Sequence, residues 1–271
     1  IELGTFIGLT MALCATVRSI PTLAAVGWTL ISYTIFAVLF FAGPIALISG
    51  ELSTMLPQEG GPQLWVKTAL GSKWGFVVAW LLWVQMFPGM VMVASTLGPL
   101  LGNTFGNVHL GENHWFVLGC ILVIYWIITI LNLKFDMAKV GGNIGVWLGV
   151  YIPVLVMFVL GLLSMIKVGL TPGGYLGAFS WSKVLPNLEN MDTFKYLARI
   201  AFIFVGIEMS SVYIPRLKDA TKNYTKGVFI SLIGLVLLNV INAMFVANIV
   251  PNGKMELSNI TQPILLYCDV L

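Results

Sequence analysis

Charged residues are scarce in this sequence. Asp, Glu, Lys and Arg make up 9% of the chain, whereas a soluble domain has about 25% of such residues. Hydrophobic residues make up 58%, so the chain cannot build a water-exposed surface, and a soluble globular protein is excluded. The net charge of +3 is small and spread along the chain without a basic cluster, so we expect no nucleic-acid partner.

Cysteine and histidine are also rare. The cysteines are Cys14, Cys120 and Cys268, which lie far apart in or beside apolar runs, and the histidines are His109 and His114. These spacings fit neither a disulfide framework nor a metal site. The sequence also lacks a recognisable pair of nucleophile and base. We therefore expect no enzyme activity, no bound metal and no cofactor.

Long hydrophobic runs fill most of the chain. A membrane-spanning helix needs about 20 mostly apolar residues. Runs of this kind lie at 3–24, 28–50, 74–100, 115–133, 142–166, 194–213 and 227–250, and a further run begins near 262. Strict apolar–polar alternation is missing, so the runs predict helices rather than strands of a membrane barrel. The sequence therefore predicts an all-α polytopic protein in a lipid bilayer, with kinks at Pro44, Pro88 and Pro153.

The distribution of Lys and Arg indicates the orientation of these helices. If residue 1 lies in the cytoplasm, the cytoplasmic loops hold eight of the fourteen Lys and Arg residues, and such residues favour the cytoplasmic side. These eight are Lys67, Lys73, Lys134, Lys139, Arg216, Lys218, Lys222 and Lys226. The loops that we expect to face the cytoplasm are 51–73, 134–141 and 216–226. The loops that we expect outside are 101–114, 167–193 and 251–261.

The stretch "FIFVGIEMSS", residues 202–211, contains a carboxylate in an apolar run. An acidic residue at the centre of a membrane helix costs about 2.5–3.5 kcal/mol on translocon scales, so Glu208 needs a reason to be there. Gly206 precedes it, and glycine-interrupted helices form the mid-membrane sites of many secondary transporters. The first and sixth runs share an Ile-Pro-x-Leu ending, at 20–23 and 214–217, which suggests a pair of broken helices.

Two longer segments carry a family resemblance. "GPIALISGELSTMLPQEGGPQLWVKTALGSKWGF", residues 43–76, resembles the second helix, cytoplasmic loop and third helix start of the amino acid–polyamine–organocation (APC) superfamily. The shared features are "xELxT", a "P-x-E-G-G" turn and an amphipathic stretch that contains tryptophan. "VGIEMSSVYIPRLKDATKNYTKGV", residues 205–228, is similar to helix 6 and the following loop of that superfamily. Pro21 to Ala24, "PTLA", resembles the end of helix 1 in the bacterial glutamate/GABA antiporter branch.

The resemblance implies a LeuT-like inverted-repeat fold. Residues 1–166 would form the first five-helix repeat. Residues 167–271 would form an incomplete second repeat with helices 6 and 7 and the start of helix 8. The chain would then be a fragment that contains helices 1–7 and the start of 8, with helices 1 and 6 unwound at mid-membrane. Helix 1 departs from the family pattern, because "ALCAT", residues 12–16, stands where many relatives have a Gly-Ser-Gly break. This segment therefore does not identify the substrate.

The resemblance also implies roles for individual residues. Glu208 matches the acidic residue of the family's helix 6, which is implicated there in substrate binding, proton coupling or gating. The alternative is a structural carboxylate bonded to the amides of the broken helix. The residues expected to line the substrate site are Ala12, Cys14, Ala15, Thr16, Gln85, Phe202, Gly206 and Ile207. Gly206 and Ile207 would offer free backbone groups. The alternatives are helix packing for the small residues, a core aromatic at Phe202, an interhelical bond at Gln85 and a simple kink at Gly206.

These observations predict a secondary amino acid transporter that works by alternating access. We expect an exchanger of glutamate- or GABA-like amino acids in the plasma membrane, specifically a bacterial inner membrane, with coupling to protons left open. Uptake of neutral or cationic amino acids or of polyamines is the alternative. A membrane scaffold without transport is a third hypothesis. The sequence leaves the oligomeric state and sodium coupling open.

Overall fold

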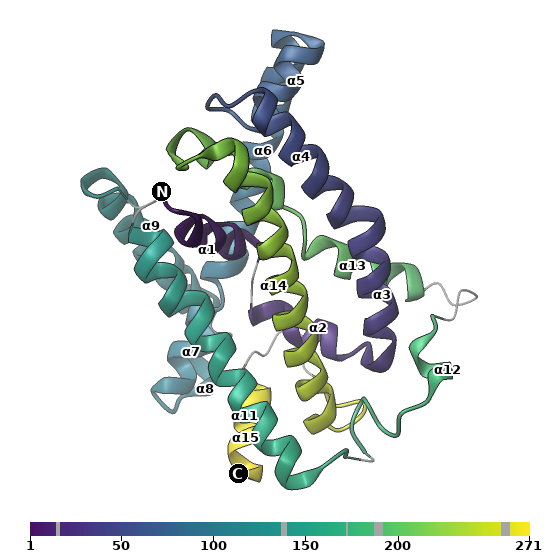
Figure 1. Ribbon diagram of the computed structural model, residues 1–271. Coiled ribbons are helices and arrows are strands. Elements are labelled where there is room, and N and C mark those ends of the chain that lie inside the picture. Colours follow the sequence, from purple (N-terminus) through teal and green to yellow (C-terminus); the bar gives the residue numbers. More distant parts are fainter. Residues whose placement is uncertain (15–16, 137–139, 172, 187–191, 256–260) are drawn as a thin grey trace. The chain divides into compact units, whose positions relative to one another are not determined.

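The computed structural model describes residues 1–14, 17–136, 140–171, 173–186, 192–255 and 261–271 (Figure 1). Its described secondary structure is helical, apart from an isolated bridge between Gly174 and Pro251. The all-α class predicted from the sequence is therefore confirmed. By internal contacts the chain divides into two compact units, unit 1 (Ile1–Gly61 with Gly141–Leu271) and unit 2 (Pro62–Val140). This division follows packing, and the assignment of residues 1–166 and 167–271 to two repeats stays a prediction.

Six helical segments in the described residues are long and apolar enough to cross a membrane. They are Gly27–Met55, Ser72–Gly102, His114–Lys134, Asn143–Val168, Thr193–Arg216 and Ala220–Ile249. They correspond to the second to seventh apolar runs of the sequence. In the first run the described α-helix Leu3–Cys14 is too short to span a bilayer alone, and residues Val17–Ser19 form a 3-10 turn. The chain is thus a multi-pass membrane protein.

Unit 1 holds most of these elements. Its α-helices are α1 (Leu3–Cys14), α2 (Ile20–Ala24), α3 (Leu30–Ala37), α4 (Gly43–Met55), α11 (Ile152–Val168), α12 (Trp181–Val184), α13 (Asp192–Phe202), α14 (Ala220–Ile249) and α15 (Gln262–Val270). Its 3-10 segments are η1 (Val17–Ser19), η2 (Gly27–Thr29) and η6 (Ile207–Arg216). Its π turns are η3 (Val38–Ala42), η4 (Gly141–Gly145) and η5 (Trp147–Tyr151).

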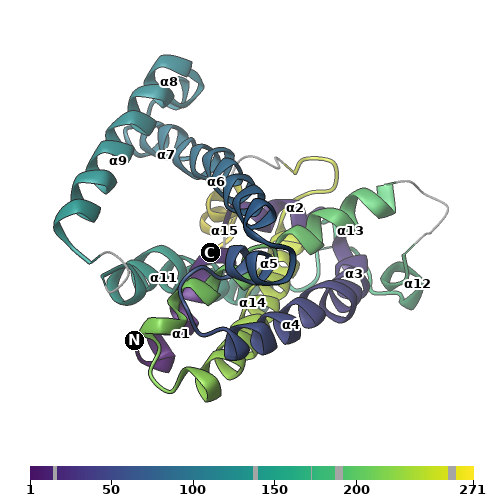
Figure 2. The ribbon, with the colours of Figure 1, turned by 90° about the horizontal axis from the view of Figure 1, so that it is seen from above.

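Helix α14 is the centre of unit 1. It packs against α1, α4, α11 and η6, and both views show it running through the middle of the unit (Figures 1 and 2). Because lipid is as apolar as these side chains, close packing rather than the hydrophobic effect holds membrane helices together. Glycines permit this approach: a Cβ on Gly227 would lie 2.6 Å from the ring of Phe6, and one on Gly161 would lie 2.6 Å from the ring of Phe245.

Two of the predicted proline kinks appear as π turns. Gly43, directly before Pro44, donates its N–H to Val38 O, and Ile152, directly before Pro153, donates to Trp147 O. A proline cannot donate to the carbonyl one turn earlier, and the wider π turn lets the backbone around it rearrange without leaving the helix. The second and fifth spans therefore bend yet remain continuous.

One end of unit 1 gathers segments that the sequence assigns to the cytoplasmic side. The N-terminal ammonium of Ile1 donates to Arg216 O, and the N–H of Lys218 donates to Ile1 O at 3.0 Å. The end of α4 lies there too, because a Cβ on Gly50 would sit 2.7 Å from Oγ1 of Thr225. The N-terminus, the end of the second span and the start of α14 therefore share one end of the unit.

The opposite end of unit 1 gathers the segments predicted to lie outside. The N–H of Leu176 donates to Ala247 O at 3.1 Å, which ties the loop between the fifth and sixth spans to the end of α14. The hydroxyl of Thr29 donates to Lys183 O at 2.7 Å, which ties the same loop to the start of the second span. The spans of unit 1 thus alternate in direction as the sequence predicts.

Unit 2 is a helical hairpin with a short amphipathic lead. Its elements are α5 (Pro62–Leu70), α6 (Ser72–Ala94), α7 (Leu97–Thr104), α8 (Val108–Glu112) and α9 (His114–Lys134). Helix α6 continues through Pro88. Helix α7 packs against α9, where a Cβ on Gly98 would lie 2.6 Å from the side chain of Val117. Asn113 is the N-cap residue of α9, and its side-chain oxygen accepts the N–H of Trp115 at 3.0 Å.

Candidate functional site

The sixth span is broken at Gly206. Helix α13 ends at Phe202, a turn occupies residues 203–206, and the 3-10 segment η6 begins at Ile207. Gly206 has φ +103° and ψ −9°, in the left-handed region that glycine enters without a steric penalty. Any other residue at this position would strain the backbone. Glycine is therefore what allows the helix to stop and restart inside the membrane.

The carboxylate of Glu208 caps this break. Its Oε2 accepts the N–H of Gly206 at 3.1 Å, and the side chain is half-buried. A helix interruption leaves backbone donors that hydrocarbon cannot satisfy, so an acceptor two residues away relieves that cost. The charge in "FIFVGIEMSS" thus has a structural partner. The same arrangement places an ionisable group directly on the interrupted backbone.

The end of α1 lies beside this break. The thiol of Cys14, the last residue of α1, lies 3.8 Å from Val205 O and donates to it. A Cβ on Gly206 would lie 3.8 Å from Leu13 O, which confirms the close approach of the two backbones. The chain resumes after Cys14 in the 3-10 turn Val17–Ser19. The end of α1 and the break of the sixth span, 191 residues apart in sequence, therefore meet side by side.

The predicted substrate-site residues separate into four sets. Cys14, Gly206 and Ile207 come together at the two interruptions, and Ile207 is fully buried. Ala12 and Phe202 lie on exposed positions, with 64% of Phe202 exposed.

The remaining predictions fall elsewhere. Gln85 lies in α6 of unit 2, whereas Ala15 and Thr16 lie outside the described residues. The structure thus brings together only part of the predicted substrate site.

The backbone groups expected to be free are hydrogen-bonded here. The N–H of Gly206 donates to Glu208, and the N–H of Ile207 donates to Phe204 O at 3.4 Å. The second of these bonds is long and therefore weak. A ligand that binds at the break must replace one of these contacts.

Two serines after the break were not identified from the sequence. The hydroxyl of Ser210 donates to Ile207 O at 2.7 Å, and that of Ser211 donates to Glu208 O at 2.7 Å. Ser210 also contacts the hydroxyl of the buried Tyr224 at 3.3 Å. Each serine stands three residues after the carbonyl that it satisfies, and this spacing directly after a glycine break is the sequence feature that indicates the role.

The cytoplasmic loop motif reaches the same helix. Gly60 and Gly61 of the "P-x-E-G-G" turn have φ values of +137° and +49°. A Cβ on Gly61 would overlap Oγ of Ser211, so the turn packs directly against η6. The conformation of this loop and the position of the second half of the sixth span are therefore physically coupled.

The fold and the two adjoining interruptions define a multi-pass helical membrane protein built around a broken-helix centre. The family model for amino acid permeases matches residues 1–271, the whole chain, so the protein belongs to the amino acid permease family. The resemblance to the APC superfamily is thereby confirmed.

Several curated proteins are similar to this chain. An uncharacterised transporter of Legionella pneumophila is 30% identical over 88% of the chain and 50% of its own length. The probable agmatine/putrescine antiporter AguD of Lactococcus lactis is 24% identical over 87% of the chain and 49% of its own length. The aspartate/glutamate permease AcaP of Lactococcus lactis subsp. cremoris is 25% identical over 76% of the chain and 42% of its own length. The chain spans about half the length of the curated relatives it matches.

Proposed function

We propose that the full-length protein containing this chain is a secondary transporter that exchanges amino acids by alternating access. The observation that carries this proposal is the side-by-side position of the two interruptions, where Cys14 contacts Val205 and Glu208 caps Gly206. In transporters with paired broken helices, one helix bundle rocks against another around a site formed by the unwound backbone. Membership of the amino acid permease family supports this class of cargo.

The cargo that we propose is a glutamate- or GABA-like amino acid. Its carboxylate would bind at the N-terminal end of η6, where it would replace a present acceptor of the N–H groups and where the helix dipole favours negative charge. The N–H of Gly206 already holds a carboxylate there, that of Glu208, which supports the suitability of this position for such a group. One similar protein is named as an aspartate/glutamate permease, which supports the same chemistry.

Glu208 would then link transport to protons. Its carboxylate and the carboxylate of the cargo compete for the N–H of Gly206, and two negative charges at one donor repel each other. Protonation of Glu208 removes its charge and weakens its hold on that donor. Proton binding therefore favours cargo binding, and release of the proton on the other side of the membrane favours cargo release.

Uptake of cationic amino acids or polyamines is a second candidate function, and Glu208 is the observation that favours it. A carboxylate beside a broken helix can pair directly with an amine, and one similar protein is named as a probable agmatine/putrescine antiporter. In this case Glu208 stays ionised and holds the cargo itself. The two candidates thus assign opposite charges to the group that binds beside Gly206.

Counterflow in proteoliposomes distinguishes these functions. Vesicles containing the full-length protein are loaded with glutamate, GABA, arginine or putrescine, and uptake of labelled external cargo is measured for each. We expect internal glutamate or GABA to accelerate uptake of the same class of cargo. Acceleration by arginine or putrescine alone would support the second candidate. Vesicles in which no internal solute accelerates uptake would leave the membrane scaffold as the explanation.

A further inference from the structure

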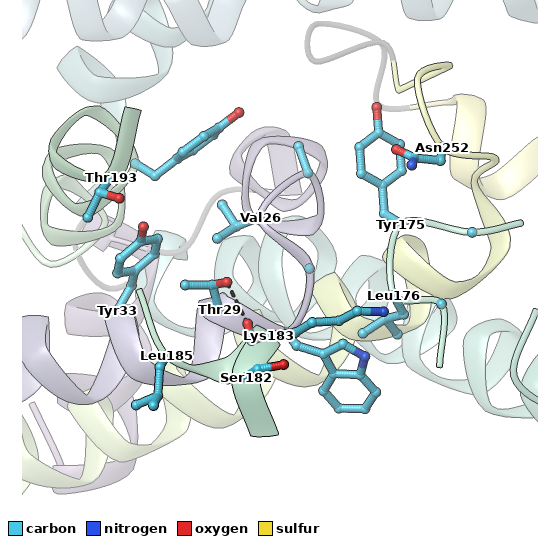
Figure 3. Close-up of a pocket in the computed structure, with 16 residues that line it drawn as sticks. Val26, Thr29, Tyr33, Tyr175, Leu176, Ser182, Lys183, Leu185, Thr193 and Asn252 are labelled. Atoms are coloured by element: carbon cyan, nitrogen blue, oxygen red, sulfur yellow. Dashed lines mark hydrogen bonds between the residues drawn. The ribbon is translucent and has the colours of Figure 1, made fainter. Parts of the chain in front are cut away.

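A cavity of about 580 Å³ lies at the end of unit 1 that the sequence predicts to face outside (Figure 3). Its walls come from the connection between α2 and α3, the loop that contains α12, the start of α13 and the segment after α14. Its lining residues differ from those beside the two interruptions, and the residues used below are Trp28, Tyr33, Tyr175, Lys183, Thr193 and Asn252.

The walls of this cavity are tied together by hydrogen bonds to backbone carbonyls. The hydroxyl of Thr29 donates to Lys183 O at 2.7 Å, and the N–H of Asn252 donates to Gly173 O at 2.8 Å. Gly27 has φ +64°, and a Cβ on it would lie 3.1 Å from Tyr175 O. The connection between α2 and α3 therefore also lies close to the loop that contains Tyr175. The cavity is therefore formed by the fold, as most binding pockets for small molecules are.

Hydroxyl, amide and ammonium side chains line the cavity, and each of them can donate a hydrogen bond. Figure 3 shows Tyr33 and Thr193 on one side and Tyr175 and Asn252 on the other. Tyr33 and Thr193 are each only 6% exposed. The indole N–H of Trp28 is buried and has no hydrogen-bond partner among the described residues. This N–H is closed to a water-sized molecule, and the indole packs edge-on against Phe179 with 4.9 Å between the ring centroids.

Lys183 determines the sign of the charge in the cavity. Among the described residues that line it, Lys183 alone carries a formal charge at neutral pH. Its ammonium donates to Ala178 O at 3.0 Å, and since an ammonium has three N–H donors it can also bind an acceptor in the cavity. A polyamine would meet this positive charge without a carboxylate to offset it, whereas a carboxylate would meet complementary charge.

We propose that this cavity is a second, outer site that binds the carboxylate of an amino acid before it reaches the broken helices. The ammonium of Lys183 holds the carboxylate, and the tyrosines pack against the rest of the molecule. This inference rests on the proposed transport of amino acids and specifies the cargo further, because it selects solutes that carry a carboxylate over those that carry only amines.

Lys183 variants of the full-length protein test this site in proteoliposomes. We expect Lys183→Met to raise KM for external glutamate about threefold to fivefold, the size of one partly solvated ion pair, with maximal rate unchanged. Lys183→Arg keeps the charge and should restore a KM close to the original. Lys254→Met, which removes an exposed charge at the same end but outside the cavity, is the control and should change KM by less than about twofold. Equal effects of the Lys183→Met and Lys254→Met substitutions would overturn the proposal.

A labelling experiment reports occupancy independently of transport. Ser182 also lines the cavity. A cysteine introduced by Ser182→Cys is labelled from outside with a membrane-impermeant maleimide, in a full-length protein whose other accessible cysteines, Cys120 and Cys268 among them, are replaced by serine. We expect glutamate to slow this labelling and putrescine to leave it unchanged. If glutamate slows labelling in vesicles that show no exchange, the cavity proposal stands and the transport proposal fails. If exchange occurs and glutamate does not slow labelling, the cavity is not a binding site.

Discussion

At the scale of single residues, the two positions that define the break are Gly206 and Glu208. The left-handed backbone of Gly206 exposes an N–H, and the carboxylate of Glu208 accepts it at 3.1 Å. A charge in a membrane segment therefore has a local reason, the satisfaction of a donor that lipid cannot satisfy. The structural role and the proposed coupling role are compatible, because protonation changes the strength of the same hydrogen bond.

Substitution of Glu208 separates these two roles. Glu208→Gln keeps an oxygen acceptor for Gly206 but cannot ionise, so we expect it to fold and insert while the pH dependence of exchange becomes flat. Glu208→Ala removes the acceptor as well, and we expect a further loss of about 1–2 kcal/mol in stability and weaker cargo binding. Exchange rates measured across a pH series, together with thermal unfolding in detergent, check both outcomes.

The control for these variants is Glu2→Gln, which removes an exposed carboxylate near the N-terminus. It should leave the pH profile of exchange unaltered. An unchanged pH profile in Glu208→Gln would mean that Glu208 acts only as a cap for the broken helix.

Gly206→Ala tests the backbone conformation itself. Space is available for the new methyl group, since its nearest neighbour would be Leu13 O at 3.8 Å, but φ of +103° is strained for alanine. We expect a loss of about 1–3 kcal/mol in stability and a reduced exchange rate. Gly4→Ala, in the first turn of α1 with no atom within 4 Å, is the control and should be neutral or slightly stabilising. If the Gly206→Ala protein were as stable as the Gly4→Ala protein, the break would not require a positive φ at residue 206.

At the scale of elements, the sixth span is held from two directions. On one side α1 and α14 pack along η6, where Ser210 reaches the hydroxyl of Tyr224. On the other side the turn at Gly61 packs against Ser211, which in turn satisfies Glu208 O. A short chain of contacts therefore connects the cytoplasmic loop motif to the residue that caps the break.

Gly61→Ala tests this connection. The new methyl group would overlap the hydroxyl of Ser211, and φ of +49° adds backbone strain, so we expect the turn to move away from η6. Trypsin should then cleave faster at Lys67, in the helix that follows the turn, and exchange should slow.

Two further variants isolate the contact with η6. Gly71→Ala carries greater backbone strain, at φ +90° and ψ 172°, but the new methyl group has no atom within 4 Å. We expect it to change exchange and cleavage less than Gly61→Ala does. Ser211→Gly combined with Gly61→Ala should restore part of the original behaviour, because it removes the overlapping hydroxyl. Equal defects in Gly61→Ala and Gly71→Ala would assign the effect to backbone strain alone.

At the scale of the whole molecule, the contacts within unit 1 group its loops at two ends, and the positive charges assign the cytoplasm to one of them. Single cysteines in a protein that lacks Cys120 and Cys268 test this arrangement with a membrane-impermeant maleimide. Thr68→Cys and Thr221→Cys should label only after the inner face is exposed, and Asn107→Cys and Asn252→Cys should label in intact cells. Cys14 can remain, because it is only 6% exposed. Labelling of positions 68 and 221 from opposite faces would contradict the topology.

The sequence by itself determined that the chain lies in a lipid bilayer, which segments can cross it, and where the sixth span is broken. These are local properties: the length of an apolar run sets whether it can cross a bilayer, and Gly206 alone permits a positive φ there. The resemblance in residues 43–76 and 205–228 also identified the family, which the match over the whole chain confirms. The carboxylate at 208 was recognised as unusual for the same local reason, its cost in hydrocarbon.

The tertiary structure alone decided which of these groups meet. The contact between Cys14 and Val205, the packing of Gly61 on Ser211 and the lining of the cavity around Lys183 join residues that are far apart in sequence. No local pattern encodes such meetings, because they depend on the path of every helix between the two residues. This is also why Phe202, adjacent to the break in sequence, lies exposed in the structure: the side on which a residue emerges follows from how the helix is packed.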